Sequence, residues 1–166
     1  MINKGSRLLI TGSGGMLGDT VYSCFSGICS VCATDIYVFE PWLNCLDVRD
    51  YDAFEYAVRD FKPTAIFHLA ALTDLEFCEE NPVDAYDTNS LGTEHAALLS
   101  KKYRALIVYI STAGIFDGQL DIYTEFDTPN PINIYGRSKY AGEAYVTSYL
   151  DSFFVFRSGW MMGGGP

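Results

Sequence analysis

The chain has 166 residues, 49% of them hydrophobic and 15% aromatic, which is enough to bury the core of one folded domain and argues against disorder. Its formal net charge of −10 argues against a nucleic-acid backbone or an anionic membrane surface as its main partner. No apolar run approaches the roughly 18 residues of a membrane span, and Met1–Arg7 lacks the pattern of a signal peptide.

Short apolar runs alternate with helical patterns through the first part of the chain. The strands are predicted at Arg7–Thr11, at Ser30–Asp35, around Cys45–Val48, and at Ala65–Leu69 after Pro63. The helices between them are predicted at Met16–Ser26 and at Asp50–Phe61, with Asp50 as the cap of the second.

The same alternation continues to the end of the chain. The predicted elements are a helix over Asp84–Tyr103 with Pro82 near its start, a strand at Leu106–Ser111, a loop over Gly114–Asn133, a helix over Tyr135–Leu150, a strand at Phe153–Arg157 and a loop at Gly163–Pro166. Strands separated by helices form parallel sheets. We therefore predict an α/β fold, a doubly wound parallel sheet (Rossmann type), as one cofactor-binding domain over residues 1–166.

A glycine-rich segment, Thr11–Gly18, follows the first strand and opens the first helix. Gly12 allows a tight turn, Gly15 lets the backbone approach a pyrophosphate closely, and Gly18 lets the helix pack against the sheet. The helix N-terminus then presents free N–H groups and partial positive charge to the phosphates. The strand before and the helix after this segment favour a dinucleotide-binding loop.

Asp35 follows Gly18 by 17 residues and ends the second predicted strand. An acidic residue about 20 positions after the glycine motif typically binds the adenosine ribose. No Lys or Arg lies between Arg7 and Arg49, so a 2′-phosphate would meet a carboxylate with no nearby cation in this stretch. We therefore predict NAD as the cofactor, with NADP as the alternative.

Tyr135 and Lys139 are four residues apart on a predicted helix, and that spacing places both on one face. A cation beside a phenol favours phenolate, which lowers the tyrosine pKa from its usual value of about 10. A phenol tuned in this way can exchange a proton with a substrate hydroxyl or carbonyl. The pair therefore predicts a proton-transfer site.

Five cysteines lie at positions 24, 29, 32, 45 and 78, and Cys29 and Cys32 have CxxC spacing. A zinc site would need further ligands, and neither His68 nor His95 falls in a zinc-like cluster. We predict no metal site and expect buried or half-buried free thiols in a reducing cytoplasm. His68 is expected to be a hydrogen-bonded core residue, and His95 a surface or packing residue.

Taken together, these motifs resemble the extended short-chain dehydrogenase/reductase family over essentially the whole chain. The matching positions are Thr11–Gly18, Asp35, Asp47–Val48, His68–Ala71, Asn89 with Gly92–Thr93, Ser111–Thr112 and Tyr135 with Lys139. Three stretches look most like sugar-nucleotide reductases of the dTDP-4-dehydrorhamnose reductase type; they are Ser111–Gly118, Pro131–Glu143 and Phe156–Trp160. Such a reductase would act in the synthesis of polysaccharide precursors in the cytoplasm.

The resemblance implies roles for individual residues. Thr112 would hydrogen-bond the reacting sugar oxygen, Tyr135 would donate the proton, and Lys139 would bind the nicotinamide ribose and lower the tyrosine pKa. The implied cofactor-binding set is Gly12, Gly14, Gly15, Met16, Leu17, Asp35 at the adenosine ribose, Asp47 and Val48 beside the adenine, Ala70 and Ala71 in the cleft, Tyr135 and Lys139.

Two features depart from the reductases that the chain resembles. Ala113 and Gly114 stand where those reductases usually carry Asp and Tyr after the Thr, and neither can transfer a proton. Family members also usually continue for another hundred or more residues, with a substrate-binding domain. We therefore expect this 166-residue form to bind dinucleotide but to show little or no turnover.

Two alternatives to a reductase stay open. One is an NAD-dependent sugar-nucleotide epimerase, and the other is a non-catalytic, cofactor-binding regulatory subunit. The resemblance also implies a homodimer through the helices at 84–103 and 135–150, with a sugar nucleotide as substrate and no nucleic-acid or membrane partner.

Overall fold

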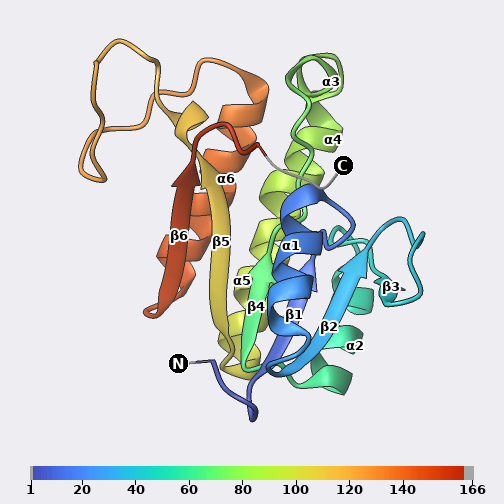
Figure 1. Ribbon diagram of the computed structural model, residues 1–166. Helices are drawn as coiled ribbons and strands as arrows, with labels where there is room; N and C mark the ends of the chain where they lie inside the picture. Colours follow the sequence, from blue (N-terminus) through green and yellow to red (C-terminus); the bar gives the residue numbers. More distant parts are fainter. Residues whose placement is uncertain (1, 163–166) are drawn as a thin grey trace.

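A computed structural model describes residues 2–162, and Figure 1 shows a parallel sheet with helices on both faces. The strands are β1 (Arg7–Thr11), β2 (Ser30–Asp35), β3 (Leu43–Cys45), β4 (Ala65–His68), β5 (Leu106–Thr112) and β6 (Phe153–Ser158). They lie in the order β3-β2-β1-β4-β5-β6, and every neighbouring pair is parallel. The predicted Rossmann-type α/β fold is therefore confirmed.

The helical elements connect these strands. They are α1 (Met16–Phe25), α2 (Tyr51–Phe61), α3 (Leu75–Glu80), α4 (Pro82–Tyr86), the π-helical turn η1 (Asp87–Leu91), α5 (Gly92–Tyr103), the 3-10 turn η2 (Ala113–Ile115) and α6 (Ile134–Tyr149). Asp50 caps α2 as predicted, because its side chain accepts a hydrogen bond from the Ala53 amide.

Alternation along β1 divides the core into two layers. Leu9 joins Phe54, Val58 and other buried residues beneath α2, α5 and α6, whereas Leu8 and Ile10 pack toward α1. Figure 1 accordingly shows α1 on one face of the sheet and α2 and α5 on the other. The first βα turn, which carries the glycine-rich segment, thereby opens at the carboxyl edge of the sheet, where ligands bind in open α/β folds.

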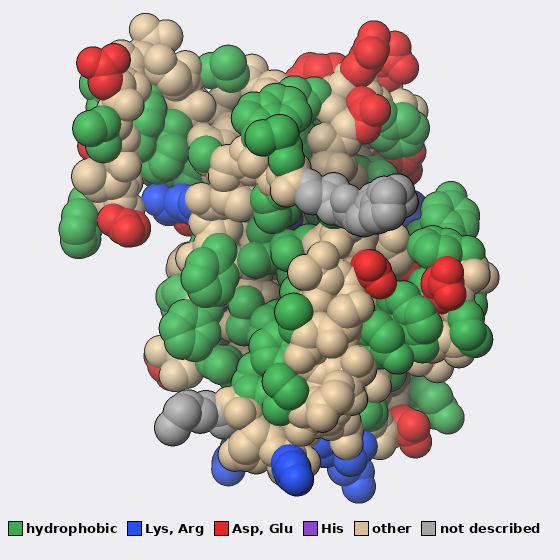
Figure 2. All heavy atoms as spheres, viewed as in Figure 1, with side chains coloured by type: hydrophobic (Ala, Val, Ile, Leu, Met, Phe, Trp, Pro, Cys, Tyr) green, Lys and Arg blue, Asp and Glu red, His purple; other side chains and the backbone are tan. Residues whose placement is uncertain are grey.

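The α1 face of the sheet is only partly covered among residues 2–162. Figure 1 shows α1 in front of β1 and β4 but not in front of β6, which is the edge strand at the end opposite β3. Phe154 and Phe156 on β6 are 54% and 53% exposed, and their rings stack with centroids 6.2 Å apart. Figure 2 shows hydrophobic side chains on this face of the molecule.

The structure corrects several predicted elements. The third strand is Leu43–Cys45 and lies earlier than predicted, and its pairing with β2 ends where Cys45 meets Asp35. The predicted helix over Asp84–Tyr103 begins at Pro82 and is divided by the π turn η1. The short helix α3 was not predicted, although Asp74 caps it by accepting from the Phe77 amide. The predicted loop at Gly163–Pro166 lies outside the described residues.

The cysteine prediction is correct in one respect and wrong in another. All five thiols are free, and Cys78 is buried. Cys24 and Cys45 are exposed, because the first lies on the outer side of α1 and the second ends the edge strand β3.

Replacing Gly18 by alanine is expected to lower the free energy of unfolding by about 1–3 kcal/mol. A Cβ atom at this position would overlap the backbone of Gly12 and Ser13, so the turn or α1 must move. Gly27→Ala is the matched control, because a Cβ atom there meets nothing within 4 Å, and its effect should stay within about 0.5 kcal/mol. Urea denaturation of both variants measures the difference, and equal stabilities would contradict the packing role of Gly18.

Candidate active site

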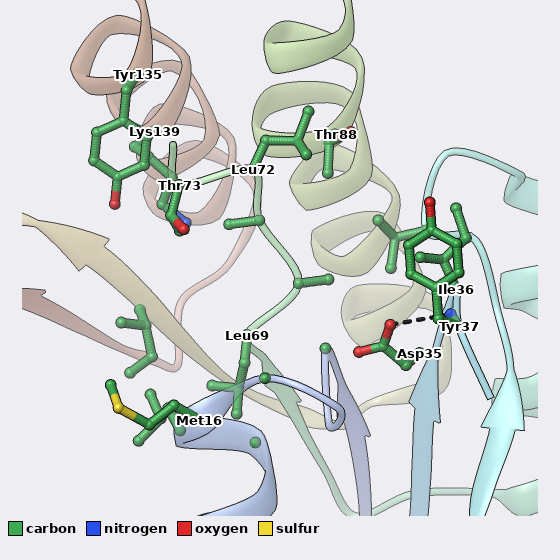
Figure 3. Close-up of a pocket in the computed structure, with 18 of the residues that line it drawn as sticks. Met16, Asp35, Ile36, Tyr37, Leu69, Leu72, Thr73, Thr88, Tyr135 and Lys139 are labelled. Carbon is green, nitrogen blue, oxygen red and sulfur yellow. Dashed lines mark hydrogen bonds between the residues drawn. The ribbon is translucent and has the colours of Figure 1, made fainter. Parts of the chain in front are cut away.

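A cavity of about 480 Å³ lies at the carboxyl edge of the sheet, between the glycine-rich segment and α6. Figure 3 shows Tyr135 and Lys139 at one end of it, and Asp35 and Tyr37 at the other. Of the predicted set it is lined by Gly12, Gly15, Met16, Leu17, Asp35, Asp47, Val48, Ala70, Ala71, Tyr135 and Lys139. Gly14 and Thr112 are not among the residues that line it.

The glycine-rich segment folds as tightly as its sequence indicates. Gly12 has φ +71°, and a Cβ atom there would lie 2.6 Å from the Ala70 amide nitrogen. Gly15 is the N-cap of α1, so the N-terminus of that helix faces the cavity. The backbone and the helix dipole together suit a bound phosphate group.

Asp35 lies at the end of β2 and is tied to this segment. Its Oδ2 atom accepts a hydrogen bond of 2.9 Å from the Gly14 amide, and Oδ1 accepts one of 3.2 Å from the Tyr37 amide. Gly14 therefore acts on the cavity through Asp35, and its amide has a partner within the chain. The carboxylate stays at the cavity wall, where a ribose hydroxyl could donate to it.

Two residues that the sequence did not predict for the site contact Asp47 and Val48, and of these two Arg49 lines the cavity and His95 does not. Arg49 lines the cavity and pairs with Asp47, with 2.9 Å between Nε and Oδ1, which lowers the pKa of the Asp47 carboxyl. His95 lies on α5, and its Nδ1 is 3.0 Å from the Val48 carbonyl oxygen. Because a carbonyl only accepts, that nitrogen carries the proton. Arg49 stands two residues after Asp47 in the sequence, whereas nothing local to His95 indicates this contact.

Tyr135 and Lys139 both line the cavity from α6, as their spacing predicts, but their electrostatics differ from the expectation. Burial raises the pKa of Tyr135, and a hydrogen bond with Thr112 acts in the opposite direction. Lys139 is 3% exposed, and burial lowers its pKa from 10.5 to about 7, although Glu143 opposes this. Its Nζ atom lies 4.3 Å from the centroid of the Tyr109 ring. Lys139 is not among the groups that lower the pKa of Tyr135, so burial leaves that pKa above its usual value.

Thr112 ends β5 and reaches the site through Tyr135. It is buried, and its Oγ1 atom accepts a hydrogen bond of 3.0 Å from the Gly114 amide, which caps η2. Its side chain acts to lower the pKa of the Tyr135 phenol, so the two predicted catalytic residues lie close together. Ala113 is exposed and supplies no polar side chain beside them.

His68 is a core residue, as predicted. Its Nδ1 is 2.9 Å from Thr11 Oγ1 and its Nε2 is 3.1 Å from Thr93 Oγ1. Thr93 donates its own proton to the Asn89 carbonyl, so Nε2 of His68 is the donor to Thr93. Burial lowers the pKa of His68 from 6.5 to about 3, which keeps the ring neutral.

Asn89 holds one wall of the cavity in place. Its side chain accepts a hydrogen bond of 2.8 Å from the Leu72 amide and donates one of 2.9 Å to the Leu72 carbonyl. It also donates to Ser138 Oγ at 3.0 Å, and Ser138 donates to the Tyr135 carbonyl. Asn89 lies in η1, and π-helical turns of this kind are frequent at functional sites.

Known proteins share both sequence and fold with this chain. Residues 6–166 match the family described as the RmlD substrate binding domain. The chain belongs to this family.

Two relatives of this RmlD family member carry different names. It is 33% identical over 158 residues to "Methionine adenosyltransferase 2 subunit beta" of Xenopus laevis, covering 95% of this chain and 47% of that protein. It is 30% identical over 161 residues to "dTDP-4-dehydrorhamnose reductase" of Aggregatibacter actinomycetemcomitans, covering 95% and 52%. The chain therefore spans about half the length of the relatives it matches.

Solved structures agree with the fold. The dTDP-4-dehydrorhamnose reductase of Bacillus anthracis, in complex with NADP, superposes with a TM-score of 0.84 at 32% identity, covering 94% of this chain and 54% of that one. The UDP-glucose 4-epimerase of Thermus thermophilus, in complex with NAD, gives 0.82 at 27% identity, covering 91% and 54%.

Two further observations concern membrane-spanning helices and metal-binding groups. Within residues 2–162, no helix is both long and apolar enough to cross a membrane. In the same part of the chain, no group of three or more His, Cys, Asp or Glu residues is placed to hold a metal ion.

Proposed function

We propose that the protein is an NAD(P)-dependent reductase of a 4-keto sugar nucleotide, of the dTDP-4-dehydrorhamnose reductase type. The observation that supports this best is the shared cavity, which has the glycine-rich segment and Asp35 toward one end and Tyr135 and Lys139 at the other. The residues fit a dinucleotide, because Gly12 leaves room for close approach and the N-terminus of α1 faces the phosphate position. The relatives named for this reduction support the choice of reaction.

The roles follow from position and chemistry. A bound nicotinamide would supply the hydride to a sugar carbon. Tyr135 would donate a proton to the carbonyl oxygen that becomes a hydroxyl, and Thr112, which lies close to the phenol, would orient that oxygen. Lys139 would bind the nicotinamide ribose from the same face of α6. Hydroxyls of the nicotinamide ribose that approach Lys139 would favour its charged form. The charged form would in turn lower the pKa of Tyr135.

The test is a titration followed by a turnover assay. Purified protein should quench or shift NADH fluorescence on binding, and an active form should consume NADH in proportion to the 4-keto sugar nucleotide reduced. We expect the 166-residue chain itself to bind dinucleotide with little or no turnover, since it spans about half of its relatives. Failure to bind any nicotinamide dinucleotide would overturn the proposal, and robust turnover by this chain would contradict the second expectation.

Cofactor choice depends on Asp35. We expect NADH to bind more tightly than NADPH, because the Asp35 carboxylate would accept from the ribose hydroxyl and repel a 2′-phosphate. Asp35→Asn keeps the shape but removes the charge, so the NADH-to-NADPH preference should shrink about tenfold. Asp60→Asn, on the exposed side of α2, is the control. At least tenfold tighter binding of NADPH by the unaltered protein would contradict this role.

An epimerase is the first alternative, supported by the solved structure of a 4-epimerase of similar fold. An epimerase oxidises and re-reduces its sugar with no net change in cofactor. Net stoichiometric consumption of NADH, as the reductase requires, separates the two.

A regulatory subunit is the second alternative, and two observations favour it. One is the relative named as a methionine adenosyltransferase subunit, and the other is the absence of proton-transferring side chains at Ala113 and Gly114. A protein of this kind would bind dinucleotide and yet keep its effect on a partner when Tyr135 is replaced. The retained Tyr135 and Lys139 at the cavity, with Thr112 at the end of β5 close to Tyr135, favour the reductase.

A further inference from the structure

Ser111 carries a buried hydroxyl without a partner. The residue is 1% exposed, and its Oγ atom makes no hydrogen bond within the described part of the chain. A buried hydroxyl that gives up water without gaining a partner costs free energy, on the order of 1–3 kcal/mol. Such a group calls for an explanation, and where the residue also lines a cavity a bound ligand can supply the partner.

The position of Ser111 shows where that partner would lie. Side chains alternate along β5, so Ser111 shares a face with Tyr109, whose ring lies beneath the Lys139 amine. Ser111 lines the cavity together with Tyr135 and Lys139, and it lies on β5, which β1 and β4 separate from Asp35 on β2. The Ser111 carbonyl already accepts from Ser158 Oγ, so the strand is held in place while the side-chain hydroxyl stays free.

Ser100 provides a comparison within the same protein. Its hydroxyl is equally buried and equally without a partner, but it lies on α5 and does not line the cavity. The two serines thus share burial and chemistry and differ in access to the cavity. A difference in ligand binding between them therefore reports on the cavity and not on the cost of a buried hydroxyl.

We infer that Ser111 is a binding residue for the nicotinamide riboside half of a dinucleotide, a role that rests on the proposed function. Its hydroxyl can both donate and accept, which matches a carboxamide or a ribose hydroxyl. The adenosine half belongs at the far end beside Asp35, so Ser111 does not contact it.

Binding of three ligands tests this assignment in the 166-residue chain. NAD⁺, ADP-ribose and ADP are titrated calorimetrically into the unaltered protein, Ser111→Ala and Ser100→Ala. We expect Ser111→Ala to weaken NAD⁺ binding by about 3- to 10-fold and to leave ADP binding unchanged. ADP-ribose then identifies the bonded group, because it weakens alongside NAD⁺ if the partner is the second ribose and stays unchanged if the partner is the carboxamide. Ser100→Ala should leave all three affinities unchanged.

Several results would overturn the inference. Unchanged NAD⁺ binding by Ser111→Ala, while the unaltered protein binds NAD⁺, removes Ser111 from the site and leaves the proposed function standing. Equal weakening of ADP and NAD⁺ places the effect in the pyrophosphate or adenosine region instead. If the unaltered protein binds none of the three ligands, the proposed function and this inference fail together.

Discussion

Replacing Tyr135 by phenylalanine is expected to lower kcat for reduction of a 4-keto sugar nucleotide by about 10²–10⁴-fold. The change removes the hydroxyl that would donate the proton, but it keeps the ring of a residue that lines the cavity. The measurement is steady-state turnover with NADH, in any form of the protein that shows activity. NADH affinity should change little, because the proton donor acts on the reacting sugar.

Tyr145→Phe is the matched control, since Tyr145 lies on the same helix, packs against Tyr149 and does not line the cavity. Its kcat should equal that of the unaltered protein. If Tyr135→Phe keeps full turnover, then Tyr135 is not the proton donor and the enzymatic role assigned to α6 is wrong.

Replacing Lys139 by methionine is expected to stabilise the fold by about 2–4 kcal/mol at pH 6 while weakening dinucleotide binding. Burial of the amine lowers its pKa from 10.5 to about 7, which means that the folded state holds the charged form poorly. Methionine fills a similar space without that cost. Urea denaturation across a pH series, with NADH titration at pH 7, measures both effects.

The pH window of the Lys139 effect follows from the two pKa values. Below pH 7 the amine is charged in both states, so the unaltered protein bears the full penalty. Between pH 7 and 10.5 only the unfolded state stays charged, so the penalty falls as pH rises and disappears above 10.5. The advantage of Lys139→Met should shrink in the same window. A pH-independent advantage, or one shared by the exposed control Lys102→Met, would contradict this origin.

Much of the fold could be predicted from the sequence because its signals are local. Asp50 marks the start of α2 through its own side chain, and the glycine spacing of Thr11–Gly18 fixes a strand, a turn and a helix in order. The π turn could not be predicted in this way. The contacts made there, from Asn89 to Leu72 and from Gly92 to Val48, join segments far apart in the sequence.

The candidate site was likewise predictable only where its signals are local in the sequence. The positions of Asp35, Tyr135 and Lys139 at the cavity follow from spacing and strand ends, but the ionisation of the Tyr135–Lys139 pair does not. A helix face shows which side chains are neighbours, whereas the pKa of each depends mainly on how deeply the tertiary fold buries it. His95 was missed because its partner, Val48, is far away in the sequence, whereas Arg49 was missed although its partner Asp47 stands two residues before it.

The hydrogen bonds between Asn89 and Leu72 affect how much conformational entropy the protein would lose on binding a ligand. Residues 69–74 have no regular secondary structure, yet Leu72 has both its amide and its carbonyl held by one side chain, as a neighbouring strand would hold them. The Asn89 side chain thus makes the two backbone hydrogen bonds to Leu72 that a neighbouring strand would otherwise make. The wall that an incoming molecule meets there is already ordered, so little conformational entropy need be lost on binding, and the interaction energy goes mainly into affinity.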